Sequence, residues 1–185
     1  FSRKLQEKTG LPLHYLDMIF HKSDKTTLSR EEFDPLLMQI LENDEWIIDG
    51  NYQRTMALRL GYCDTVIWLD YPLDVCLSGI EQRRGHKRED LPWIEDEVDE
   101  EFIGFVKGFE QNVRPEIIKL LESTQGKRII VFKTREESDE FLESLNYEES
   151  FKVASWFYGP GERKAQKLKN ITYIPCHLRY MSKNR

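Results

Sequence analysis

The stretch DTVIWLDYP at residues 64–72 decides the fold class, because five consecutive apolar or β-branched residues are followed by a turn with proline. A strand without polar alternation is buried on both faces, which is typical of a parallel sheet covered by helices. Similar runs occur at 45–52 (EWIIDGNY), 128–134 (RIIVFKT) and 11–20 (LPLHYLDMIF). Segments of helical periodicity separate them. The alternation predicts an α/β fold, a doubly wound parallel sheet with helices on both faces.

Several helix ends can be read directly from the residues. Ser29 stands three residues before Glu32, the spacing of a capping box, so a helix should begin directly after Ser29. Gly10 is expected to end a helix over residues 1–9. Pro115 should break the helix that starts near the acidic run EDEVDEE, because proline lacks the amide proton of a helix interior.

Length, composition and charge favour one domain with a chemically distinct end. The chain has 185 residues, of which 39% are hydrophobic, enough for a real core. Its longest run without Asp, Glu, Lys or Arg is nine residues, so no membrane span is expected. Residues 151–185 hold eight basic residues and one acid, a net charge of +7. Because the whole chain has a net charge of −6, residues 1–150 carry −13. We expect a domain over 1–150 and a basic C-terminal extension over 151–185, which docks on the sheet as helix and strand or stays disordered.

The three cysteines, Cys63, Cys76 and Cys176, are scattered along the chain without a C-x-x-C pair. Neither a structural zinc site nor a disulfide framework is therefore expected. A reducing, cytoplasmic location fits this cysteine usage best.

Charged residues follow the predicted strands, at the sheet edge where ligands of doubly wound folds bind. Asp17, Asp49 and Asp70 each end or follow a strand, and the loop at 83–88 contains Arg83, Arg84, Lys87 and Arg88. Carboxylates beside a basic loop indicate a metal-bound polyphosphate. The simpler alternatives are that Asp49 and Asp70 are turn residues and that the basic loop is a solvated surface.

Four segments carry a resemblance to known families. WIIDGNYQRT (46–55) resembles the LLDGFPRT segment of adenylate kinases, and VIWLDYPLDVCLSGIEQRR (66–84) resembles their next strand, helix and lid arginine pair. More closely, residues 5–20, 44–55 and 128–142 resemble the bacterial DNA topology modulation protein family, small P-loop proteins of the adenylate-kinase-like group. The resemblance covers roughly residues 1–146 and implies the three-layer fold of P-loop nucleoside kinases.

The resemblance implies roles for residues that contact the acceptor and the metal. Asp49 would hold water bound to Mg²⁺, and Arg54 would grip the phosphate or carboxylate of the acceptor. Asp17 lies where related kinases place an acceptor-binding acid. Arg114, from the long helix after the lid, would join them on the substrate.

It also implies a lid over about residues 83–100 and an adenine site. Arg84 and Arg88, with Arg83, would close over the transferring phosphoryl group. The adenine contacts of ATP would come from Lys133, Thr134 and Arg135.

The sequence departs from this family in one large respect. The family has a strand and a Gly-rich GxxxxGK[ST] loop directly before a helix like FSRKLQEKTG, and no such pattern occurs in these 185 residues. We expect that the first strand and the P-loop precede Phe1 and are missing from this chain; the alternative is a protein that lacks them.

Together these features predict ATP-dependent, Mg²⁺-assisted phosphoryl transfer to a nucleotide, a nucleoside or a small hydroxy acid, by a monomer or homodimer. The alternatives are a nucleotide-binding regulator that affects DNA topology indirectly and a degenerate, non-catalytic P-loop relative. Direct nucleic-acid binding is expected, if at all, only through the basic tail, because a domain at −13 repels a duplex.

Overall fold

The computed structural model describes residues 1–145 and 168–176, and within them one sheet of five parallel strands. The strand order is β1-β2-β5-β3-β4, and all four neighbouring pairs are parallel. This confirms the α/β class with a parallel sheet between helices. The strands are β1 (Leu13–Tyr15), β2 (Trp46–Asp49), β3 (Thr65–Leu69), β4 (Arg128–Phe132) and β5 (Asn170–Ile174).

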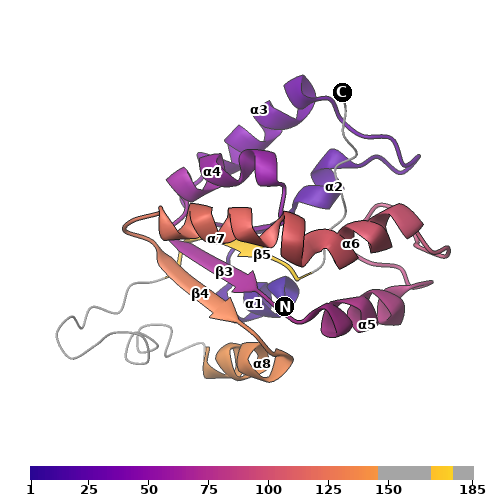
Figure 1. The fold of residues 1–185 in the computed structure, drawn as a ribbon. Coiled ribbons are helices and arrows are strands. Elements are labelled where there is room, and N and C mark those ends of the chain that lie inside the picture. The colour runs from indigo at the N-terminus through magenta and orange to yellow at the C-terminus, as the bar shows by residue number, and fades with distance from the viewer. Residues whose placement is uncertain (146–167, 177–185) are drawn as a thin grey trace.

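Helices cover both faces of the sheet (Figure 1). One face packs against α2, α3, α4 and α7, and the other against α1 and α8, while α5 and α6 lie beside the carboxyl ends of the strands. The helices are α1 (Ser2–Thr9), α2 (Leu16–Phe20), α3 (Arg30–Leu41), α4 (Gln53–Tyr62), α5 (Leu73–Arg83), α6 (Glu100–Asn112), α7 (Arg114–Glu122) and α8 (Arg135–Ser144).

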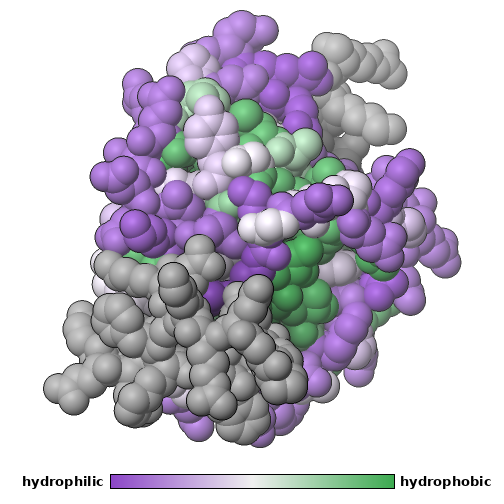
Figure 2. All heavy atoms as spheres, turned by 90° about the vertical axis from the view of Figure 1, so that its left-hand side faces the viewer, coloured by the Kyte–Doolittle hydropathy of each residue, from purple (hydrophilic) through white to green (hydrophobic). Residues whose placement is uncertain are grey.

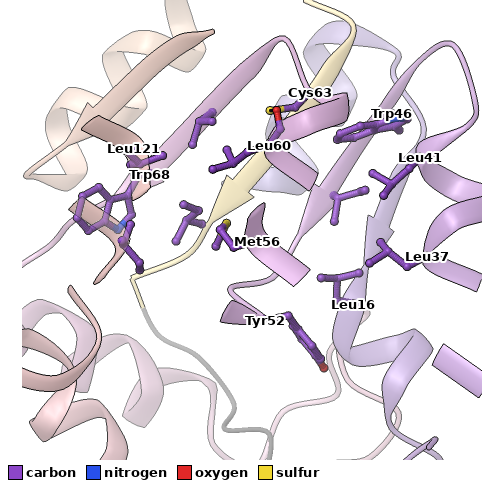
Figure 3. Packing of buried hydrophobic residues seen from close by; sticks show 14 of the residues in the cluster. Leu16, Leu37, Leu41, Trp46, Tyr52, Met56, Leu60, Cys63, Trp68 and Leu121 are labelled. Carbon is purple, nitrogen blue, oxygen red and sulfur yellow. The ribbon is translucent and has the colours of Figure 1, made fainter. Parts of the chain in front are cut away.

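Two apolar cores, one on each face, hold these layers together. The larger core interleaves Trp46 and Trp68 from the strands with helix residues such as Met56, Leu60 and Leu121 (Figure 3). The second core joins the opposite strand faces to α1 and α8. Successive side chains of a strand point to opposite faces of the sheet, and both faces are covered by helices. The strand sequences are therefore continuously apolar.

The local sequence signals are confirmed at three helix ends. Ser29 and Glu32 form the reciprocal capping box at the start of α3, and Gly10 ends α1 with a left-handed φ of 71°. The helix is interrupted between α6 and α7. Pro115 lies in the first turn of α7, where a backbone amide has no partner within the helix, so the missing amide proton does not destabilise it.

Residues 11–20 were expected to form a short strand that runs into a loop, and only the strand is confirmed. β1 ends at Tyr15, and the next five residues form α2, in which Leu16 and Phe20 are buried. These two side chains are four residues apart, so they share one face of a helix and pack into the larger core.

The central strand of the sheet comes from the part of the chain that the sequence assigned to the basic extension. β5 pairs with β2 on one side and with β3 on the other, and Ile171–Ile174 are buried. Residues 146–167 and 177–185, the remainder of the predicted extension together with the end of the predicted domain, lie outside the described residues.

The surface of the described part is largely hydrophilic in the view of Figure 2, with a group of hydrophobic side chains among the polar ones. None of the described helices is both long and apolar enough to cross a membrane.

Candidate functional site

A cleft of about 560 Å³ opens at the carboxyl ends of β1, β2 and β5. Its walls come from the start of α1, the end of α5 and the segment between α5 and α6. The structure brings four of the predicted site residues, Asp17, Asp49, Arg83 and Arg88, into this cleft. The charged residues of its lining are Arg3, Lys4, Asp17, Asp49, Arg83, Lys87, Arg88, Glu89, Asp90 and Glu95.

Asp49, the last residue of β2, lies at the floor of the cleft. Its Oδ2 accepts a hydrogen bond of 2.6 Å from the hydroxyl of Ser2 in α1. Burial raises the pKa of Asp49 to about 7, with a further contribution from the charges of Asp90 and Asp17, while the Ser2 hydrogen bond acts in the opposite direction. Near neutral pH this carboxyl group is therefore able both to hold and to accept a proton.

The turn after Asp49 is held by a buried arginine that sequence reasoning missed. Arg59 of α4 is 0% exposed and donates hydrogen bonds to the carbonyl oxygens of Gly50 (2.8 Å) and Tyr52 (3.3 Å). Burial lowers the pKa of Arg59 to about 10, so it stays charged at neutral pH. Arg59 follows Met56 by three residues and Thr55 by four, so all three share one face of α4. This spacing could have indicated that Arg59 is buried together with Thr55 and Met56.

Glycine is required at the start of this turn. Gly50 has a φ of 146°, and a Cβ atom there would lie 2.9 Å from the Cβ of Leu16. The turn also presents Tyr52, whose hydroxyl donates a 2.7 Å hydrogen bond to Oδ1 of Asp17. The Asp17 carboxylate is thereby oriented at the edge of the cleft.

The segment between α5 and α6 contributes Arg88, which is held by two acids of the same segment. Its Nε lies 2.8 Å from Oδ1 of Asp90, and its Nη1 lies 2.7 Å from Oε2 of Glu95. Burial would lower the pKa of Arg88, but the bonds to Asp90 and the charge of Glu95 outweigh it and raise the pKa. Through these contacts Arg88 links Asp90 and Glu95 within the predicted lid.

Arg83 is the other arginine of the cleft wall. It is half-buried at the end of α5, and burial, followed by the charge of Arg88, lowers its pKa. The charge of Arg88 is compensated by Asp90 and Glu95, so Arg83 is the arginine of this wall that is better suited to contact an anionic ligand group.

Three predicted arginines lie outside the lining of this cleft. Arg84 forms an ion pair with Glu81 on the surface of α5. Arg54 points to Asp34 of α3, with one contact of 2.9 Å between Nη1 and Oδ2. Arg114 is bound to Asp70, so the structure does not bring it to Asp17 and Asp49.

Asp70 organises a second hollow of about 350 Å³ on the α5–α6 side. The Arg114 guanidinium donates to both carboxylate oxygens, at 2.9–3.1 Å, and the Lys133 ammonium forms an ion pair with Oδ2. Although burial acts in the opposite direction, these two cations lower the pKa of Asp70. Asp70 is thus more than a turn residue, since it joins β3, α7 and the loop after β4.

The residues expected at the adenine line a separate groove of about 480 Å³. The Thr134 hydroxyl accepts from the amide of Glu137 and caps α8, and Arg135 Nη2 donates to the carbonyl of Val75 at 3.4 Å. Lys133 borders this groove as well as the hollow around Asp70.

The described residues do not by themselves form a metal site or a triphosphate cradle. No group of three or more His, Cys, Asp or Glu side chains that could hold a metal ion occurs among residues 1–145 and 168–176. The central strand β5 is followed by Pro175 and Cys176 rather than by a glycine-lysine loop.

Comparison of the chain with known protein families, with characterised proteins and with solved structures gave no match.

Proposed function

We propose that this chain is a phosphotransferase of the adenylate-kinase-like group, similar to the DNA topology modulation family, which transfers a phosphoryl group from ATP to a small acceptor. The observation that carries the proposal is the convergence of Asp17, Asp49, Arg83 and Arg88 on one cleft at the carboxyl edge of a parallel sheet. These four residues come from distant parts of the chain, and all four are among the residues that the strand-end and lid patterns of the sequence selected.

The acid side of the cleft is suited to an acceptor hydroxyl. Asp17, oriented by Tyr52, can accept a hydrogen bond from a hydroxyl or an amine of the acceptor. Asp49 can take up the hydroxyl proton, because a pKa of about 7 places it near the operating pH of a general base. The Ser2 hydroxyl fixes the direction in which the remaining lone pairs of Asp49 point.

The basic residues of the cleft are suited to the group that is transferred. Arg83 and Lys87 line the same cleft as the acids, where they can neutralise phosphoryl oxygens. In phosphoryl transfer, a protein contributes mainly by positioning the reactants and neutralising their charge, and less by covalent chemistry of its own. Mg²⁺, when bound with ATP, would supply the remaining positive charge.

A second candidate function is ligand binding without transfer, as in a regulator or a degenerate relative. One observation favours it: no glycine-lysine loop exists in the 185 residues, and the position after the central strand holds Pro175. The cleft would then bind a small anionic ligand without a phosphoryl donor beside it.

Calorimetry and a transfer assay separate these functions. The chain is titrated with ATP and Mg²⁺, and transfer of labelled phosphate to nucleoside monophosphates, nucleosides and hydroxy acids is followed. Asp49→Asn should abolish transfer, whereas Glu122→Gln, an exposed acid of α7 far from the cleft lining, should leave it unchanged. Binding of ATP without any transfer supports the second function, and a chain that binds neither ATP nor an acceptor refutes both.

A further inference from the structure

Two of the three cysteines meet in the structure although they are 100 positions apart in the sequence. Cys76 lies in the first turn of α5, and Cys176 follows β5 by two residues. Cys176 packs against the small apolar cluster that contains Cys76, Phe102 and Val106, and the two thiol groups are within hydrogen-bonding reach of each other. Cys63 lies elsewhere, in the larger core, and its Sγ is 3.8 Å from the carbonyl oxygen of Leu60.

The surroundings of the pair allow a small reagent to reach it. Both cysteines line the hollow of about 350 Å³ around Asp70. Cys76 is buried at 4% exposure, and its Sγ is 3.6 Å from the carbonyl oxygen of Tyr71, whereas Cys176 is partly exposed. A reagent entering the hollow therefore meets Cys176 first.

Exposure divides the roles of the two thiols. Cys176 is partly exposed at the hollow, so a reagent has better access to its sulfur than to the buried sulfur of Cys76. Cys76 differs, because the hydrogen bond with Cys176, followed by burial, raises the pKa of its thiol. Cys176 is thus the better nucleophile of the two, and Cys76 is positioned to react second.

We propose that Cys76 and Cys176 are a redox modification site, which closes into an intramolecular disulfide when the protein meets a hydroperoxide. The Cys176 thiolate attacks the peroxide oxygen, the O–O bond breaks, and a sulfenic acid and hydroxide are formed. The Cys76 sulfur then attacks the Cys176 sulfur, the S–O bond breaks, and the thiol proton leaves with the hydroxyl group as water. Two thiols and one hydrogen peroxide give one disulfide and two waters.

The proposed bond joins two elements that border the cleft. α5 carries Arg83 at its far end, and Pro175, next to Cys176, lines the cleft floor. A covalent link between the start of α5 and the end of β5 would hold this wall against the floor. The pair is compatible with a reducing compartment, where a disulfide of this kind is transient and responds to oxidants.

The test is oxidation of the complete reduced chain with increasing hydrogen peroxide, followed by alkylation and mass spectrometry without reductant. We expect the loss of two hydrogen atoms, a linked peptide pair containing Cys76 and Cys176, an alkylated Cys63, and full reversal by dithiothreitol. A disulfide that includes Cys63, a bond between two molecules only, or three thiols that all remain reduced or oxidise independently would overturn the proposal.

Single variants test the order of the two steps. Cys63→Ser should form the linked peptide pair as readily as the unchanged chain. Cys76→Ser should stop at a sulfenic acid on Cys176 that dimedone traps, and Cys176→Ser should slow the first oxidation at least tenfold. Equal trapping on both cysteines would refute the assigned order, and circular dichroism of each variant confirms that it is folded.

Discussion

Replacing Asp49 with asparagine should stabilise the fold, and the gain should depend on pH. The carboxyl group has a folded-state pKa of about 7, against an ordinary value of 3.8, because burial opposes its charge. At 1.36 kcal/mol for each pKa unit, this difference corresponds to about 4 kcal/mol. The substituted amide side chain would keep an oxygen that accepts from the Ser2 hydroxyl and would carry no charge.

The direction of the pH dependence follows from proton binding. Between pH 3.8 and about 7 the folded chain holds a proton on Asp49 that the unfolded chain has lost, so the stability of the unchanged protein falls as pH rises through this window. The gain from Asp49→Asn should be near zero at about pH 4, increase up to about pH 7 and then level off. We expect a plateau of about 2–4 kcal/mol, the lower figure allowing for the partial contact of Asp49 with water in the cleft.

Urea denaturation followed by tryptophan fluorescence, at half-unit pH steps from about 4.5 to 8 in buffer with EDTA, measures this gain directly. The chelator removes divalent cations that would bind the carboxylate. Glu122→Gln serves as the matched control, since it neutralises an exposed acid and should give the same small change at every pH. A gain from Asp49→Asn that is constant with pH, or that shrinks as pH rises, would refute the reasoning.

Four further predictions concern single contacts and the central strand. Arg59→Met should destabilise the chain by about 2–4 kcal/mol in urea, because two carbonyl oxygens of the turn after β2 lose their donor in a buried site; Arg59→Lys should recover part of the loss. Asp70→Ala should cost about 1–3 kcal/mol, since it leaves two partly exposed cations without their shared carboxylate. In a working transfer assay Arg83→Ala should lower the rate more than Arg84→Ala, because only Arg83 lines the cleft. Truncation after Ser150 should abolish cooperative unfolding in circular dichroism, since it removes β5; a truncated chain with an unchanged melting curve would contradict the central position of this strand.

The parts of the fold that were predictable are those in which local and tertiary preferences agree. The run TVIWL is apolar on both faces and forms β3. The capping box at Ser29 specifies the start of α3 by itself. The run NITYI at 170–174 has the same β-branched and apolar character, but the +7 charge of residues 151–185 assigned it to an extension, and the sequence left open whether that extension docks on the sheet or stays disordered. Charge describes the solvated side chains of a segment, and the apolar ones decide where it is buried.

The candidate site was predictable to the level of strand ends but not to the level of individual contacts. The strand-end rule selected Asp17 and Asp49, because the carboxyl ends of parallel strands lie at one edge. The resemblance put Arg84 ahead of Arg83 in the transfer step, whereas in the structure Arg83 lines the cleft and Arg84 pairs with Glu81, because neighbouring residues at the end of α5 point in different directions. The pairing of Arg54 with an acid from another helix has no sequence signature.

The place of β5 in the sheet has a consequence for synthesis on the ribosome. The residues that fill the middle of the sheet are translated after the other four strands, so β2 and β3 cannot be bridged while those strands emerge. Until then each of these nascent strands exposes an unpaired edge that can pair with other chains. Expression yield should therefore respond to chaperones that bind emerging polypeptides, and to the speed at which codons 146–174 are read.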